Sequence, residues 1–231
     1  MTKEELEIEL FRCGEENYTG NFVAAAVQIK DGYAYHAGLL ICCEEGTFLF
    51  HFNALEIVLE EPPNDDWYFY KIFTFIDTRL VSAFLALCKN VQKESAPNFG
   101  TYYDGSYFDH SGIYFSKIVR SEYMTCVGFC VNVIKGFLSD EEEVEVFQFK
   151  DWTNADLSPS YLNTFVDKLK LQNPSADVNL LSDNVRRILP IEYIAAAYLK
   201  TMPFKRKNIA TIVPSLELVI KERIPEISDS N

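Results

Sequence analysis

The first half of the chain alternates between short apolar segments and polar turns, which is the pattern of β-strands. The turn Glu44-Glu45-Gly46 separates two of these segments and predicts a β-hairpin. The segments on either side of this hairpin are also rich in aromatic and β-branched residues, which favours the strand conformation there as well. Strands are expected over Asn21–Lys30, Tyr35–Cys42, Thr47–Phe52, Leu55–Glu60 and Trp67–Phe75.

The pattern changes to helical spacing further along the chain. Asp77 can cap a helix whose apolar residues recur every three or four positions up to Val91. The segment Thr125–Leu138 has almost no polar face, so we expect a helix that is buried on nearly all sides. Thr125 can cap its start, and Gly136 lies near its end.

The last third of the chain is predicted to be helical. A short strand is expected over Val144–Phe149, followed by helices that begin near Ser158-Pro159, Pro190 and Pro214. Residues 95–111, rich in Asn, Gly, Asp and Tyr, are expected to form a long loop. The sequence therefore predicts an α+β domain over residues 1–150 and a helical C-terminal extension over residues 151–231 that packs on it.

Composition places the chain among globular proteins, because 48% of its residues are hydrophobic and 14% are aromatic. No apolar run approaches the roughly 20 residues that span a bilayer, so no stable membrane insertion is expected. The acidic start of the chain lacks the layout of a secretory signal. We therefore expect a cytoplasmic location.

The charge is strongly negative and uneven. A net charge of −13 argues against nucleic-acid binding. Residues 1–66 hold 14 acidic and 3 basic residues, whereas residues 186–223 hold 8 basic and 3 acidic residues. These are interpreted as two solvated faces that attract each other. The alternative is a basic docking surface around Lys205-Arg206-Lys207.

Six cysteines, at positions 13, 42, 43, 88, 126 and 130, show no spacing typical of a disulfide framework. Most are expected to be free thiols packed as small hydrophobic groups. Cys126 differs because it falls in the first turn of the predicted buried helix, where free N–H groups stabilise a thiolate. Cys130, one turn further, should be buried and inert.

Two of the three histidines are predicted to meet on the sheet. If Glu44–Thr47 forms the hairpin turn, His36 and His51 lie opposite or nearly opposite each other on adjacent strands. One imidazole can then act as a base while the other forms a hydrogen bond to the second ring nitrogen of that base and orients it, as a catalytic triad requires. The third histidine, His110, lies in the predicted loop.

Three sequence pieces together resemble the circularly permuted papain-like proteins of the NlpC/P60 superfamily: His36-Ala37-Gly38-Leu39, then His51, then Cys126-Val127-Gly128-Phe129. That group includes lecithin:retinol acyltransferase and its relatives, YiiX-type proteins and PPPDE peptidases. The order, and the spacings of 15 and 90 residues, are compatible with it over about residues 20–150. The resemblance implies an antiparallel sheet packed on a buried nucleophile helix, with extra C-terminal helices here.

The resemblance also implies a function. We expect a cysteine-dependent hydrolase of the amidase or peptidase type, acting through a Cys126-His36-His51 triad and an acyl-enzyme intermediate, without a cofactor. A small amide, peptide or acyl compound is the expected substrate. Tyr35, Tyr123 and His110 are expected to contact it. His110-Ser111-Gly112-Ile113 repeats the His-x-Gly pattern, but His36 is preferred as the base because it alone has a partner histidine on the following strand.

Other functions stay open at this point. A metal site formed by His36, Cys42, Cys43 and His51 is disfavoured, because adjacent cysteines on a strand point to opposite faces. The chain can also be a lipid acyltransferase or thioesterase. A further alternative is an inactive papain-like binding module that engages a protein partner through surface aromatic residues: Trp67, Tyr68, Tyr70, Tyr102, Tyr103 and Tyr107.

Overall fold

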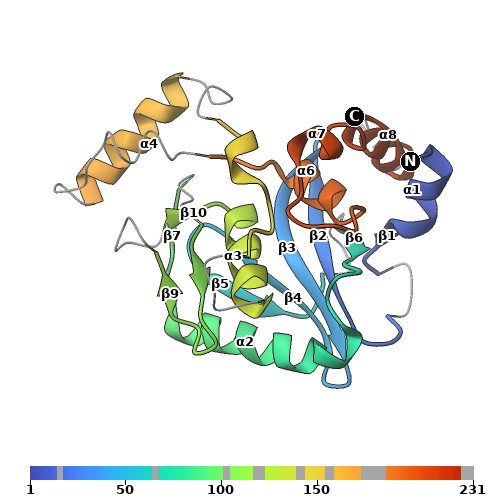
Figure 1. Cartoon of the computed structure of the whole chain (residues 1–231), viewed down its shortest axis with the longest axis horizontal. Coiled ribbons are helices and arrows are strands. Elements are labelled where there is room, and N and C mark those ends of the chain that lie inside the picture. The colour runs from blue at the N-terminus through green and yellow to red at the C-terminus, as the bar shows by residue number, and fades with distance from the viewer. Residues whose placement is uncertain are drawn as a thin grey trace, which may run out of the picture.

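The computed structural model describes residues 1–14, 18–63, 68–100, 105–116, 123–138, 144–153, 159–172 and 186–224. The fold is α+β, with a six-stranded antiparallel sheet and helices that pack against it (Figure 1). The strand order is β1-β6-β2-β3-β4-β5. These strands are β1 Phe11–Arg12, β2 Phe22–Lys30, β3 Tyr33–Cys43, β4 Gly46–Phe52, β5 Ile57–Glu60 and β6 Tyr68–Ile72.

Helices and short strands make up the rest of the described chain. Two small sheets join β7 to β10 in parallel and β8 to β9 in antiparallel orientation. None of the described helices is both long and apolar enough to cross a lipid bilayer. The elements are α1 Lys3–Glu9, η1 Thr78–Leu80, α2 Val81–Glu94, β7 Asn98–Phe99, β8 Tyr107–Phe108, β9 Tyr114–Phe115, β10 Tyr123–Met124, α3 Cys126–Leu138, η2 Phe149–Asp151, α4 Pro159–Gln172, α6 Pro190–Ala196, α7 Arg206–Ile209 and α8 Val213–Arg223.

The main sheet is buried on both faces, which explains why β3 is apolar at nearly every position. Leu39 and Ile41 point into the main core, where α2, α3 and α6 cover the sheet. Leu40 and Cys42 point the other way, into a smaller cluster that includes Tyr70. Strand alternation therefore places the buried side chains of β3 from Leu39 to Cys42 alternately in two separate apolar environments.

The predicted hairpin is confirmed. β3 and β4 pair from Cys43 opposite Gly46 to Gly38 opposite His51, with Glu44 and Glu45 forming the turn. Lys89 of α2 reaches this turn and pairs with Glu45 at 2.6 Å. The hairpin fixes the register of the two strands and so decides which of their side chains become neighbours.

Helix α3 begins and packs as its sequence predicts. The Gly128 N–H donates to Thr125 Oγ1 at 3.0 Å, so Thr125 caps the helix. Nine of its residues are buried, and Phe129 packs against Phe50 of the sheet with ring centroids 5.1 Å apart. Near its end, Gly136 allows the backbone of β8 to approach, because a Cβ there would collide with the Phe108 carbonyl.

The C-terminal helices belong to the same core as the sheet. α6 packs against β2 and β3, and α8 packs against α1 and α6. The start and the end of the chain meet here: Lys3 Nζ lies 2.5 Å from Glu222, and Arg223 donates to the Leu10 carbonyl. The one ion pair joins a lysine of the acidic start to a glutamate of the basic end, so these contacts do not use the charge asymmetry of the sequence.

Several predictions about local structure need correction. Residues 144–149 form no strand, because Phe147 makes only an isolated bridge with Phe204 and packs its side chain in the core. The predicted aromatic surface is wrong for Tyr68, Tyr70 and Tyr107, which are buried in the sheet clusters and against β9. The other members of that surface (Trp67, Tyr102 and Tyr103) and the predicted cap Ser158 lie outside the described residues.

Candidate active site

One cleft of about 380 Å³ brings together the residues that the sequence singled out for catalysis. Cys126, His36 and His51 all line it, and so does Tyr35. It lies where β4 ends, since Phe52 and the two residues after it line the same cleft. No residue of the described C-terminal helices lines it, so these helices leave it open.

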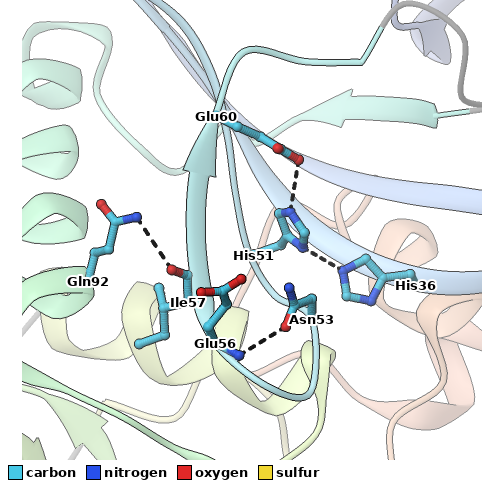
Figure 2. A network of polar contacts seen from close by, with 7 residues as sticks. All are labelled: His36, His51, Asn53, Glu56, Ile57, Glu60 and Gln92. Atoms are coloured by element: carbon cyan, nitrogen blue, oxygen red, sulfur yellow. Dashed lines mark hydrogen bonds and ion pairs between the residues drawn. The ribbon is translucent and has the colours of Figure 1, made fainter.

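The two histidines form a hydrogen-bonded chain with a carboxylate, which Figure 2 shows. His36 Nε2 lies 2.9 Å from His51 Nδ1, and His51 Nε2 lies 3.2 Å from Glu60 Oε1. The register explains the chain: Gly38 is opposite His51, so His36 is a diagonal neighbour of His51 on the same face. Glu60 lies on β5 opposite Leu49 of β4, so it is likewise a diagonal neighbour of His51.

The chain of three side chains determines where the protons sit. An ionised Glu60 only accepts hydrogen bonds, so His51 Nε2 carries a proton and donates it. In the neutral His51 ring, Nδ1 then has a lone pair and accepts the N–H of His36 Nε2. His36 Nδ1 is left without a proton. In Figure 2 it points away from His51, as a general base should.

Burial keeps both imidazoles neutral. Desolvation, together with the neighbouring His51 ring, lowers the pKa of His36 to about 4. Desolvation also lowers the pKa of His51, although the hydrogen bond and the negative charge of Glu60 partly offset this effect. Both rings are therefore bases at neutral pH, which is the state that the proton arrangement requires.

Cys126 is the first residue of α3, and its sulfur faces backbone N–H groups. Those of Ala37, Val127 and Cys126 itself lower the pKa of the thiol, but burial outweighs them and the pKa is raised overall. Among the described residues, no hydrogen bond joins this thiol to either imidazole. The reason is strand alternation: His36 projects from the face opposite to Ala37, whereas Cys126 packs on the Ala37 side.

The other five cysteines do not line this cleft. All six thiols are free, and Cys126 is partly exposed whereas the other five are buried. Cys130, one turn further along α3, has no exposed surface, and burial raises its pKa well above the ordinary value. The burial of Cys130 agrees with its prediction, whereas the predicted stabilisation of a Cys126 thiolate is outweighed by burial, which raises the pKa of that thiol as well.

The structure separates the three predicted substrate contacts. Tyr35 lines the cleft, whereas His110 and Tyr123 do not. His110 lies in a turn whose backbone carbonyl accepts a hydrogen bond from Asn90 of α2, and Tyr123 is buried in β10. Sequence reasoning missed Glu60, although the strand that contains it follows the hairpin directly and could have been placed beside His51. It also missed Gln28, Asn53, Tyr68 and Phe99, which line the cleft.

A metal centre finds no support in the described part of the chain. It contains no group of three or more His, Cys, Asp or Glu side chains arranged to hold one ion. In the cleft itself, each histidine nitrogen that faces a neighbour is engaged in a hydrogen bond. The side chains thus bind one another rather than converging on a common point.

Comparisons with protein-family models, with curated proteins and with solved structures each find no match for this chain. The fold and the cleft define the class to which it belongs. It is an α+β protein with a six-stranded antiparallel sheet, and its cleft combines one thiol with a Glu-His-His chain.

Replacing Glu60 by glutamine is expected to lower the pKa of His51 further, because the charge that raises it is removed while an acceptor oxygen is kept. NMR titration of the His51 ring protons measures this shift. Glu61→Gln is the matched control, since Glu61 is the next residue and is exposed. An equal shift in both variants would show that Glu60 has no specific role.

Proposed function

We propose that this protein is a cysteine-dependent hydrolase of the amidase or peptidase type. Cys126 is the nucleophile, His36 the general base, and His51 and Glu60 are positioning residues. One observation carries the proposal: a thiol at the start of a helix and a Glu-His-His hydrogen-bonded chain line the same open cleft. A nucleophile, a base and a group that orients the base are the three parts this chemistry needs.

The first step is proton transfer from the Cys126 thiol to His36 Nδ1. No hydrogen bond joins them directly, so the proposed transfer requires a bridging water molecule in the cleft. A volume of about 380 Å³ has room for it, and a water takes about 30 Å³ in the liquid. Burial favours the neutral thiol and the neutral imidazole, so the transfer accompanies attack on the substrate and does not precede it.

The second step is attack of the sulfur on a carbonyl carbon. The C–S bond forms as the carbonyl oxygen becomes an oxyanion, which backbone N–H groups near the start of α3 stabilise. The C–N bond then breaks, and the imidazolium returns its proton to the leaving amine. Water next attacks the thioester with His36 as base. The carboxylic acid leaves, and the thiol is restored.

The architecture supports the papain-like part of the proposal. A buried helix that starts at the nucleophile packs against an antiparallel sheet, and two adjacent strands of that sheet supply the histidines. Tyr35, Phe52 and Phe99 give the cleft aromatic walls, and Glu60 is the one carboxylate among its lining residues. A small, uncharged amide or ester fits such a lining best.

The test uses p-nitrophenyl acetate, a generic acyl donor, with the wild-type chain. We expect a burst of one p-nitrophenolate per chain, slower turnover afterwards, and an acetyl group that mass spectrometry maps to Cys126. N-Acetylcysteine amide serves as the control for unassisted thiol reactivity. A single slow acetylation at the rate of this control, without turnover, would indicate an inactive binding module and would refute the enzyme assignment.

A further inference from the structure

A second hollow, lined by residues of the C-terminal helices, has no part in the proposed catalysis. It is a groove of about 890 Å³ formed by α6, α7 and α8, which lie together in Figure 1. No residue lines both this groove and the catalytic cleft. Its size is within the range of pockets that bind ligands.

The groove has an apolar floor that continues beyond it. Leu189, Ile191, Val213 and Pro214 supply this floor, and Leu189 is 43% exposed. A smaller hollow of about 150 Å³ shares Leu189 and Ile191 and ends at Tyr33, which is 71% exposed. The two hollows are therefore adjacent and share an apolar floor, which gives room for a chain segment that spans both.

The walls of the groove are held in place by polar contacts. Glu192 Oε2 accepts the indole N–H of Trp152 at 3.1 Å, and Glu192 Oε1 pairs with Arg206 at 3.4 Å. Asp151 Oδ2 accepts the backbone N–H of Arg206 at 3.1 Å. The groove is therefore formed before any ligand enters, which reduces the entropy lost on binding.

At the α7 end of the groove the basic side chains outnumber the acidic ones. Glu192 pairs with Arg206, whereas Asp151 accepts from neutral N–H donors, which do not balance a carboxylate charge. Lys205 and Lys207 line the groove, and neither has an ion-pair partner among the described residues. The exposed carboxylate of Glu217, from α8, lines the groove where the smaller hollow joins it. Two ammonium groups thus face the ligand at the α7 end.

We propose that this groove binds a short acidic peptide segment of a partner protein. An apolar side chain of the segment lies on the Leu189–Ile191 floor, and carboxylates beside it meet Lys205 and Lys207. The charge distribution favours an acidic partner at this groove. The chain has a net charge of −13 and repels acidic segments elsewhere, whereas residues 186–223 carry 8 basic and 3 acidic residues.

Selection of random peptides of about 12 residues on the immobilised full-length chain tests this proposal. We expect enrichment of sequences in which Asp or Glu flanks Leu, Ile, Phe or Trp. The binding of a synthetic enriched peptide, followed by fluorescence anisotropy, should weaken about tenfold in a Lys205→Glu, Lys207→Glu double variant. It should also weaken between about 50 and about 300 mM salt. Lys221→Glu, an exposed lysine of α8 that does not line the groove, is the matched control and should bind normally.

Three results would overturn the proposal. They are enrichment of peptides without acidic residues, equal binding by the double variant and the wild type, and a homodimer in light scattering that the double variant abolishes. The last would assign the groove to a second copy of this chain. Cys126→Ala should bind the peptide as the wild type does, so this result is independent of whether the catalytic proposal holds.

Discussion

Replacing Cys126 by alanine is expected to abolish both the burst and the turnover of p-nitrophenyl acetate, a loss on the order of 10³-fold or more. The reason is that Cys126 is the only cysteine lining the cleft that holds the His36–His51–Glu60 chain. Stopped-flow absorbance measures the burst, and intact mass measures acetylation.

Cys130→Ala is the matched control, because Cys130 lies one turn further along the same helix and has no exposed surface. This variant should keep the burst at one equivalent per chain. Circular dichroism and thermal unfolding establish that both variants are folded. A folded Cys126→Ala chain that still turns over the ester, or a Cys130→Ala chain that loses activity while folded, would contradict the assignment of the nucleophile.

His36 is expected to make the protein sensitive to acid. Its pKa is about 4 in the folded chain, compared with an ordinary value of 6.5. Between these values the unfolded state binds the proton and the folded state does not. The free energy of unfolding therefore falls as the pH decreases from 6.5 to 4, by up to about 3 kcal/mol from this group.

Urea unfolding at several pH values between 7 and 4 measures this contribution. His36→Asn should lose less stability than the wild type over that range, by up to about 3 kcal/mol, because it lacks the buried group that must be protonated. His110→Asn is the control, since His110 is exposed and lies outside the cleft. Parallel pH profiles for the wild type and His36→Asn would show that His36 is not held in its neutral form.

Much of the site geometry could be predicted from the sequence, because it depends on local pairing. The turn at Glu44-Glu45 sets the register of β3 and β4, and that register makes His36 and His51 neighbours. Glu60 could have been found in the same way, as β5 pairs with β4 directly after it in the chain. Such contacts link strands that are adjacent in both sequence and space.

Other features could not be predicted in this way, because they join segments distant in the chain. Phe99 reaches the cleft through the pairing of β7 with β10, and the groove at Lys205 forms only when α6, α7 and α8 pack together. The burial of Tyr68 and Tyr70 likewise depends on the second cluster behind the sheet. Composition alone does not distinguish an aromatic surface from an aromatic core.

The amino-acid sequence by itself determined the longer strands of the main sheet, the hairpin and the helix that starts at Cys126, because hydrophobic period and turn chemistry act over a few residues. Only the tertiary structure decided on which side of the sheet α3 lies. β3 is apolar on both faces, with Leu39 on one and Leu40 on the other, so either face could have received the helix. That choice sets Cys126 beside the Ala37 backbone, whereas the His36 imidazole projects from the other face of β3, although both line the same cleft.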